Sequence, residues 1–271
     1  MQNFPQFEEK SFIKTREQIH AVAEVIGKFR EKLVKPIAKN DNLWLSVVEQ
    51  GFCTPPIDVI ECLELGCNLE KLIVEVADDN DKYFSLNING KTPSALGTEL
   101  KSVLSNEFKV GVEVDSNSFD STKTLAITQQ EAGDFLIQLS NFNLLLYDFW
   151  DRIESGVKTK ICLWPHHFDN AFKWFSGRKI DEQDEQMGIG VSNGDETYAL
   201  PYIYMTLWPE VRKTNTLETA EGAILHEGDW TGFVLPYESI AGQKTIDEQK
   251  AMIDDFFGVS FASIQKAFSK R

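Results

Sequence analysis

The chain has 271 residues, of which 42% are hydrophobic and 25% are charged, and its formal net charge at pH 7 is -15. This composition supports a sizeable hydrophobic core, which one large domain or two closely packed halves would share. The excess negative charge disfavours nucleic acid and anionic membranes as partners, because no basic patch interrupts it. The charged residues Glu8, Glu9 and Lys10 and the lack of any stretch of about 20 apolar residues predict a cytoplasmic protein with no signal peptide and no membrane span.

The N-terminal half, residues 1–114, is predicted to contain two helices and a group of short strands. Helical spacing of apolar residues predicts a first helix from Thr15, where Thr15 and Gln18 resemble a capping box, to Leu33. Turn sequences separate the strands that follow and favour an antiparallel meander. Thr92 then caps a second helix. The predicted strands of this half are residues 43–48, 60–65, 72–76, 83–88 and 109–114.

Residues 115–127 are expected to form a linker or exposed loop, because residues 115–124 are polar and rich in serine. The C-terminal half, residues 128–271, opens with a long helix capped by Thr128 and Glu131. Its run from 135 to 147 has no charged residue, which predicts a central, buried helix.

Four strands and a last helix, capped by Thr245 and Glu248, are predicted to complete the C-terminal half. The strands are residues 160–164, 188–191, 202–208 and 233–236. The predicted fold class is therefore α+β, with antiparallel sheets and packed helices. The order of helix, four strands and helix occurs twice, which suggests two similar halves.

The four cysteines contain no CxxC pair, and buried free thiols are favoured over a disulfide or a zinc site. They are Cys53, Cys62, Cys67 and Cys162.

Residues whose side chains can act in catalysis or bind a metal are most concentrated in the run from Trp164 to Asp169. This run holds two of the four histidines, His166 and His167. If this run is a strand, His167 and Asp169 share a face, and His226 completes two imidazoles and one carboxylate. That set is similar to the iron-binding triad of the oxoglutarate-dependent oxygenases and makes a divalent metal a possible cofactor. Those enzymes carry an Arg or Lys shortly after the last histidine, and residues 233–239 offer none.

A helical interpretation of the same region competes with the metal site. Phe168, Ala171, Phe172 and Phe175 have helical spacing, and Gly177 stands where a helix C-cap glycine is usual. Asp169 would then lie in a first helical turn, and the histidines would serve packing.

Two further segments are candidates for a binding site. The glycines from Gly188 to Gly194 favour a strand ending in a turn over a phosphate loop, because no helix follows directly; Gly188 and Gly190 would leave room for close approach of a backbone or a ligand. Strict alternation from 201 to 209 predicts a strand with Ile203, Met205 and Leu207 toward the core. The opposite face would carry aromatic residues, including Tyr202 and Tyr204.

Most of the chain resembles an uncharacterised bacterial family, a domain of unknown function. The resemblance rests on Trp164–Asp169, on Phe175-Ser176-Gly177-Arg178, and on Ser192-Asn193-Gly194-Asp195 before Pro201-Tyr202-Ile203-Tyr204. It extends to the first helix and to Gly51–Ile57. The resemblance implies no activity.

Three functions are compatible with these patterns, and the sequence leaves open whether the protein is an enzyme. The first is a module that binds a small molecule in a pocket of the C-terminal half. The second is a metal-dependent oxygenase or hydrolase using His167, Asp169 and His226. The third is a scaffold or homo-oligomer that uses the aromatic face as an interface. The candidate ligand-binding residues are Trp164, His166, His167, Asp169, Asp195, Tyr202, Tyr204 and Trp230.

Overall fold

The computed structural model describes residues 1–36, 42–59, 62–209 and 217–270. Its contacts divide the chain into two compact units. Unit 1 comprises Met1–Glu9, Asn141–Ile161 and Asp169–Arg271, and unit 2 comprises Lys10–Ser140 and Cys162–Phe168. Each unit contains one antiparallel sheet and helices, so the fold class is α+β, as predicted.

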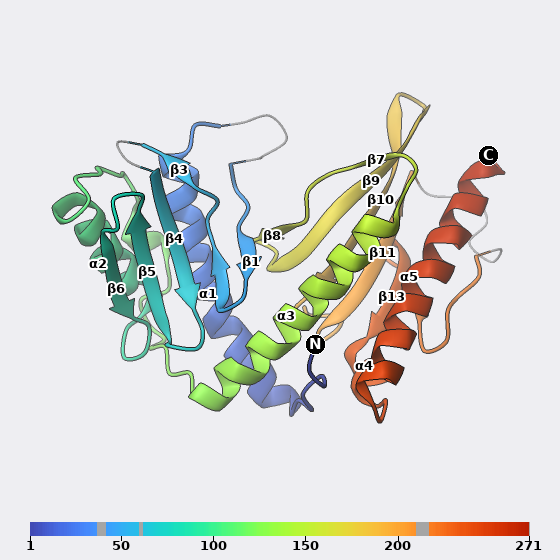
Figure 1. The fold of residues 1–271 in the computed structure, drawn as a ribbon, viewed down its shortest axis with the longest axis horizontal. Coiled ribbons are helices and arrows are strands. Elements are labelled where there is room, and N and C mark those ends of the chain that lie inside the picture. Colours follow the sequence, from blue (N-terminus) through green and yellow to red (C-terminus); the bar gives the residue numbers. More distant parts are fainter. Residues whose placement is uncertain (37–41, 60–61, 210–216, 271) are drawn as a thin grey trace. The chain divides into compact units, whose positions relative to one another are not determined.

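Unit 2 is built on a meander that α1 (Glu9–Leu33) crosses on one face (Figure 1). Its strands pair in the order β1-β2-β4-β5-β6, with β3 beside β4, and every pairing is antiparallel. Their bounds are β1 (Ser46–Val48), β2 (Gly51–Cys53), β3 (Ile57–Asp58), β4 (Cys62–Asn68), β5 (Ile73–Asp78) and β6 (Tyr83–Asn87). The expected antiparallel meander is therefore present, with two short strands that the sequence pattern did not reveal.

The start of α1 differs from the prediction, since the helix begins six residues before Thr15. Thr15 is buried within the helix at 3% exposure and is no cap. The Gln18 side chain instead accepts a hydrogen bond from the backbone N–H of Ala126 at 2.5 Å. The burial of Thr15 and the hydrogen bond of Gln18 to Ala126 therefore replace the capping box that their spacing predicted.

Helix α2 (Pro93–Asn106) follows β6 and has Thr92 as its N-cap, as predicted. The prediction of a strand at residues 109–114 is wrong, because these residues pair in no sheet and Lys109 has a positive φ of 60°. Buried Val110, Val112 and Val114 still alternate with exposed residues. Burial thus produced a strand-like pattern without strand pairing.

Residues 115–127 contain the short 3-10 helix η2 (Ser116–Ser118) and lie within unit 2. Helix α3 (Gln129–Arg152) begins with the predicted capping box, in which Glu131 N–H donates to Oγ1 of Thr128 at 3.2 Å. The helix is not buried on every side, because Leu144 and Tyr147 are 56% and 47% exposed. The division at 115–127 into halves 1–114 and 128–271 stays a prediction.

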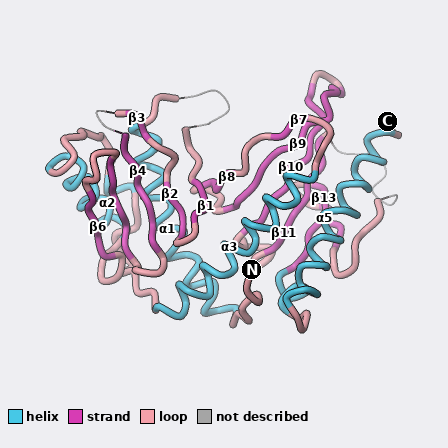
Figure 2. The backbone as a smooth tube through the Cα atoms, in the orientation of Figure 1, coloured by secondary structure: helices cyan, strands magenta, loops and turns pink. Residues whose placement is uncertain are grey.

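The strands of unit 1 pair in the order β12-β13-β11-β10-β9-β7, again all antiparallel. Figure 2 shows the long hairpin of β9 and β10 and the helix α5 beside the sheet. The bounds are β7 (Val157–Lys158), β9 (Asp169–Ile180), β10 (Gln183–Ser192), β11 (Tyr202–Trp208), β12 (Ile224–Glu227), β13 (Thr231–Pro236), α4 (Tyr237–Ala241) and α5 (Ile246–Ser269).

The two sheets differ in strand order. The main path of the unit 2 sheet follows the chain, whereas β13 of unit 1 is inserted between β11 and β12. This difference counts against a simple duplication of one half. The capping box of Thr245 and Glu248 at the start of α5 is present as predicted.

Residues paired directly across antiparallel strands point to the same side of a sheet. In the sheet of unit 1, this pairing gathers apolar side chains on one face and polar side chains on the other. Ile203, Met205 and Leu207 of β11 are fully or almost fully buried and pair with Val191, Ile189 and Met187 of β10. Residues of α5 contact β11 and β13. The prediction that these β11 side chains belong to the core is confirmed.

Cysteines are free in the part of the chain that the structure describes. Cys67 and Cys162 are buried, while Cys53 and Cys62 are half-buried. Burial and, to a smaller extent, the nearby Glu64 carboxylate raise the pKa of the Cys53 thiol to about 11. Such a thiol is a weak nucleophile at neutral pH.

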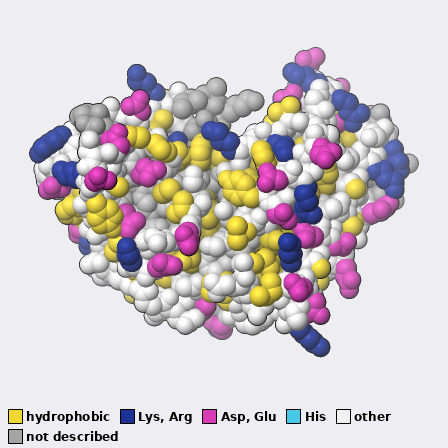
Figure 3. Space-filling model, viewed as in Figure 1, with side chains coloured by type: hydrophobic (Ala, Val, Ile, Leu, Met, Phe, Trp, Pro, Cys, Tyr) yellow, Lys and Arg dark blue, Asp and Glu magenta, His cyan; other side chains and the backbone are white. Residues whose placement is uncertain are grey.

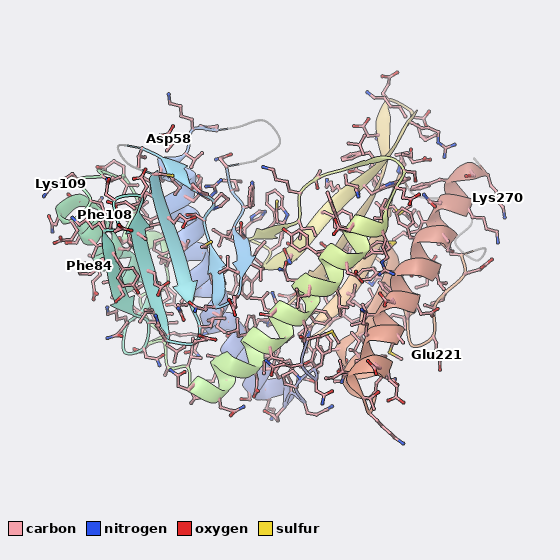
Figure 4. The ribbon with its side chains drawn as sticks, viewed as in Figure 1. Asp58, Phe84, Phe108, Lys109, Glu221 and Lys270 are labelled. Carbon is pink, nitrogen blue, oxygen red and sulfur yellow. The ribbon has the colours of Figure 1, made fainter. Side chains whose placement is uncertain are left out.

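Charges of both signs are interspersed on the face drawn in Figure 3, which shows no continuous basic area. No helix among the described residues combines the length and the hydropathy needed to cross a bilayer. Aromatic side chains lie at one edge of unit 2, where Figure 4 labels Phe84 of β6 and Phe108 after α2. Lys82 Nζ lies 5.1 Å from the ring centroid of Phe108.

Candidate functional site

The run from Trp164 to Phe168 begins in the short strand β8 (Cys162–Trp164) and continues as a tight turn. The N–H groups of His167 and Phe168 both donate to the carbonyl of Trp164, at 3.2 and 2.7 Å. Phe168 has a positive φ of 53°, which is uncommon for a non-glycine residue. The chain therefore reverses here before β9 starts at Asp169.

Unit 2 holds this turn on α1 at two points. The Nε2–H of His20 donates to the carbonyl of Pro165 at 2.7 Å. Two helical turns further along the same face of α1, the Pro165 ring packs on Gly27, where an added Cβ would lie 2.6 Å from Pro165 Cγ. A glycine at position 27 is thus needed for the close approach of the turn.

The Phe168 side chain anchors the turn in the core of unit 2. Its ring stacks on His20 at 4.8 Å with an interplanar angle of 3°, and on Phe135 of α3 at 5.9 Å. His20 and Phe168 therefore serve packing. The next two histidines differ, because His166 and His167 are exposed and their rings lie 4.2 Å apart.

Neither sequence interpretation of this region is correct in full. His167 lies in the turn and not in a strand, so the argument that alternation places it beside Asp169 fails. The helical alternative is also wrong, since residues 169–180 form β9 and Gly177 lies inside that strand with a φ of 84°. The long pairing with β10 overrides the helical spacing of the apolar residues.

The polar face of the unit 1 sheet carries three tyrosines, each with a hydrogen-bonding partner. Tyr204 of β11 donates to Oδ2 of Asp169, the first residue of β9, at 2.5 Å. Tyr202, two residues earlier on the same face, donates to Oδ2 of Asp195 at 2.5 Å. The hydroxyl of Tyr198 shares a hydrogen bond of 3.0 Å with Nδ1 of His226 on β12.

Five rings on this face form a closed circuit of contacts, which we call the aromatic cluster: Tyr198, Tyr202, Tyr204, Trp230 and His226. Taken in that order, successive ring centroids lie 4.9, 6.1, 6.3 and 4.1 Å apart, and the 5.9 Å contact of His226 with Tyr198 closes the circuit. The His226 ring stacks on Trp230 with an interplanar angle of 22°. The rings come from β11, from β12 and from the turns beside them.

The turn after β10 positions one edge of the aromatic cluster. Oδ1 of Asp195 accepts hydrogen bonds from the N–H groups of Thr197 and Tyr198, at 2.7 and 2.9 Å. The same carboxylate uses its other oxygen for Tyr202. Asp195 therefore fixes the turn and orients a ring of the aromatic cluster.

The space above the glycines of β10 is filled by neighbouring side chains of the sheet. An added Cβ at Gly190 would lie 2.8 Å from the Tyr204 hydroxyl, and one at Gly188 would lie 2.7 Å from Oγ1 of Thr206. The expected room for an approaching ligand or backbone is thus occupied by cross-strand partners.

The environment of the tyrosines keeps their hydroxyls protonated. Burial raises the pKa of Tyr202, and its hydrogen bond to Asp195 acts in the same direction. Burial also raises the pKa of Tyr204 well above its usual value, together with the negative charge of Asp169. Burial and the Asp195 charge raise the pKa of Tyr198. These phenols are hydrogen-bond donors at neutral pH and not bases.

The metal alternative finds no ligand cluster. Among the residues that the structure describes, no three His, Cys, Asp or Glu side chains are arranged to hold a metal ion. Asp169 and His226 are each engaged by a tyrosine. His167 belongs to unit 2 and the other two residues to unit 1, and the metal site at His167, Asp169 and His226 stays a prediction.

Several of the predicted ligand-binding residues meet in unit 1, where Asp169, Asp195, Tyr202, Tyr204 and Trp230 belong to or contact the aromatic cluster. Trp164, His166 and His167 belong to unit 2. Tyr198 was not among the residues predicted from the sequence. It precedes the alternating strand, and only the Asp195 turn brings it to the other rings.

Comparisons with known proteins give a family and no activity. The model of the family described as "Family of unknown function (DUF5996)" matches residues 4–267. No curated protein and no solved structure matches the chain. Because the family model covers nearly all of the sequence, the chain belongs to this family of unknown function, DUF5996.

Proposed function

We propose that this protein is a small-molecule-binding module whose site in the C-terminal half is the aromatic cluster with Asp169 and Asp195. The observation that carries the proposal is the closed circuit of five rings beside two carboxylates. Aromatic faces and carboxylates together attract organic cations, through cation–π contacts and ion pairing. The ligand class is therefore a small organic cation.

Preorganisation supports a binding role over a purely structural one. Each tyrosine hydroxyl is fixed by a carboxylate or an imidazole, so the rings lose little freedom when a ligand binds. Further negative charge lies close in the chain, because Glu227 and Asp229 flank the turn between β12 and β13 and are exposed. This charge favours a cation over an anion.

The test is titration calorimetry with choline and with dimethylbutanol, a neutral molecule of similar shape. We expect choline to bind and the alcohol to bind at least roughly tenfold more weakly, the loss of one charge-assisted contact. Trp230→Ala and Asp195→Asn should weaken choline binding. Trp208→Ala is the matched control, since Trp208 is 46% exposed and lies outside the aromatic cluster.

Equal affinity for choline and the alcohol would contradict the proposal that the ligand is a cation. Equal loss of choline binding in Trp230→Ala and Trp208→Ala would contradict the proposal that the ligand binds at the aromatic cluster. Circular dichroism of each variant distinguishes lost binding from lost folding.

A further inference from the structure

A cavity of about 450 Å³ lies in unit 2, separate from the residues of the aromatic cluster. Its volume falls within the range of roughly 300–1,000 Å³ that small-molecule sites occupy. One wall is a single face of α1, formed by residues spaced three or four apart from Ala21 to Glu31. The other walls are Leu43, Pro93 of α2, residues 118–120, and Pro165 with His166.

Packing fixes these walls before any ligand arrives. Pro165 is pressed against Gly27 and held by the hydrogen bond from His20. Phe119 packs on α2, where an added Cβ at Gly97 would lie 3.0 Å from its ring. The backbone of Asp120 accepts a hydrogen bond from the N–H of Ser94 at 3.1 Å. The cavity is thus preformed, which lowers the entropic cost of binding.

The charges around the cavity are unbalanced. Lys28 forms an ion pair of 2.7 Å with Glu31, so these two charges offset one another. The hydrogen bond from Lys28 also lowers the pKa of Glu31. Two carboxylates remain, Glu24 and Asp120. The Glu24 side chain has no hydrogen bond or ion pair with another residue in the described ranges.

Asp120 stays ionised, because hydrogen bonds from the side chain and backbone of Thr122 lower its pKa. The lining between these carboxylates is largely apolar and includes Phe119, Pro93 and Pro165. A site of this composition suits a ligand with one positive charge and an apolar body.

We propose that this cavity binds a small primary amine, with the ammonium group at Glu24 and Asp120 and the apolar body against Phe119, Pro93 and Pro165. Anions are excluded by the two carboxylates. Neutral analogues lose the charge-assisted contacts that hold the ammonium group. This site is independent of the aromatic cluster, since the two share no residue.

The experiment is titration calorimetry of the full chain with phenethylamine, phenethyl alcohol and phenylpropionate, which share a ring but differ in charge. We expect saturable binding of the amine, weaker binding of the alcohol and none of the carboxylate. Glu24→Gln and Asp120→Asn should each weaken amine binding by roughly tenfold. Ala21→Phe should abolish it by filling the cavity.

Glu70→Gln is the matched control, because Glu70 is exposed in unit 2 outside the lining and its replacement removes the same charge. Trp230→Ala should leave amine binding unchanged, which separates this site from the aromatic cluster. The proposal is overturned if no binding of the amine is detected, or if all three compounds bind equally. It is also overturned if the Glu24 and Asp120 variants bind like Glu70→Gln.

Discussion

Gly190 lies where β9, β10 and β11 meet beneath the aromatic cluster, and its replacement by alanine tests how the polar face is packed. An added Cβ would lie 2.5 Å from Ala171 Cβ, 2.8 Å from the Tyr204 hydroxyl and 2.9 Å from the Asn170 carbonyl. Two of these three atoms are fixed to the backbone of β9 and cannot rotate away. The Tyr204 hydroxyl is the one mobile neighbour, and moving it breaks its hydrogen bond to Asp169.

The cost can be estimated from these contacts. Overpacking a strand costs about 1–3 kcal/mol, and losing a hydrogen bond to a charged group costs about 1.5–3 kcal/mol. Replacing glycine in a strand returns about 0.5–1 kcal/mol of backbone entropy. We therefore expect Gly190→Ala to lower the free energy of unfolding by roughly 1.5–5.5 kcal/mol.

Urea unfolding followed by circular dichroism measures this change. Gly258→Ala is the control, because Gly258 lies inside α5 with nothing within 4 Å of an added Cβ. It should raise the free energy of unfolding by about 0.5–1 kcal/mol. A Gly190→Ala protein whose free energy of unfolding is within about 0.5 kcal/mol of wild type would refute this close packing around Gly190.

Leu139→Asp should abolish folding, because Leu139 is only 2% exposed and a buried unpaired carboxylate costs several kcal/mol of a total of roughly 5–15; a variant that still melts cooperatively would show that α3 tolerates charge there. Because burial raises the pKa of Tyr202 in the folded state, its contribution to the free energy of unfolding is present below pH about 10 and is lost as the pH rises further. Above that pH the unfolded state releases the phenolic proton while the folded state still holds it. Tyr202→Phe should reduce this alkaline loss, and an unchanged pH profile in the variant would contradict it. Limited proteolysis should cut first between Asp115 and Thr124, a largely exposed stretch; mass spectrometry would instead find the first cut within 179–186 if the β9–β10 hairpin opens more easily.

The sequence by itself determined the elements whose signals are local. Thr92, Thr128 and Thr245 mark the starts of α2, α3 and α5, because a cap needs only residues within one helical turn. Alternation over residues 202–208 predicted β11 with its core-facing residues, since one buried face imposes a period of two. The capping-box resemblance at Thr15 failed, because its partner Gln18 is held by a segment far along the chain.

Only the tertiary structure decided which residues meet in a site. The run from Trp164 to Asp169 carries histidines that suggested a metal, yet the turn at Phe168 and its stacking on His20 follow from α1, more than 140 residues earlier. Tyr198 joins the aromatic cluster through hydrogen bonds of a turn, which leave no periodic signal. Strand order also depends on the tertiary structure. Strand β13 lies between β11 and β12, because packing in the folded sheet determines which strands pair, and no local segment of the sequence contains that information.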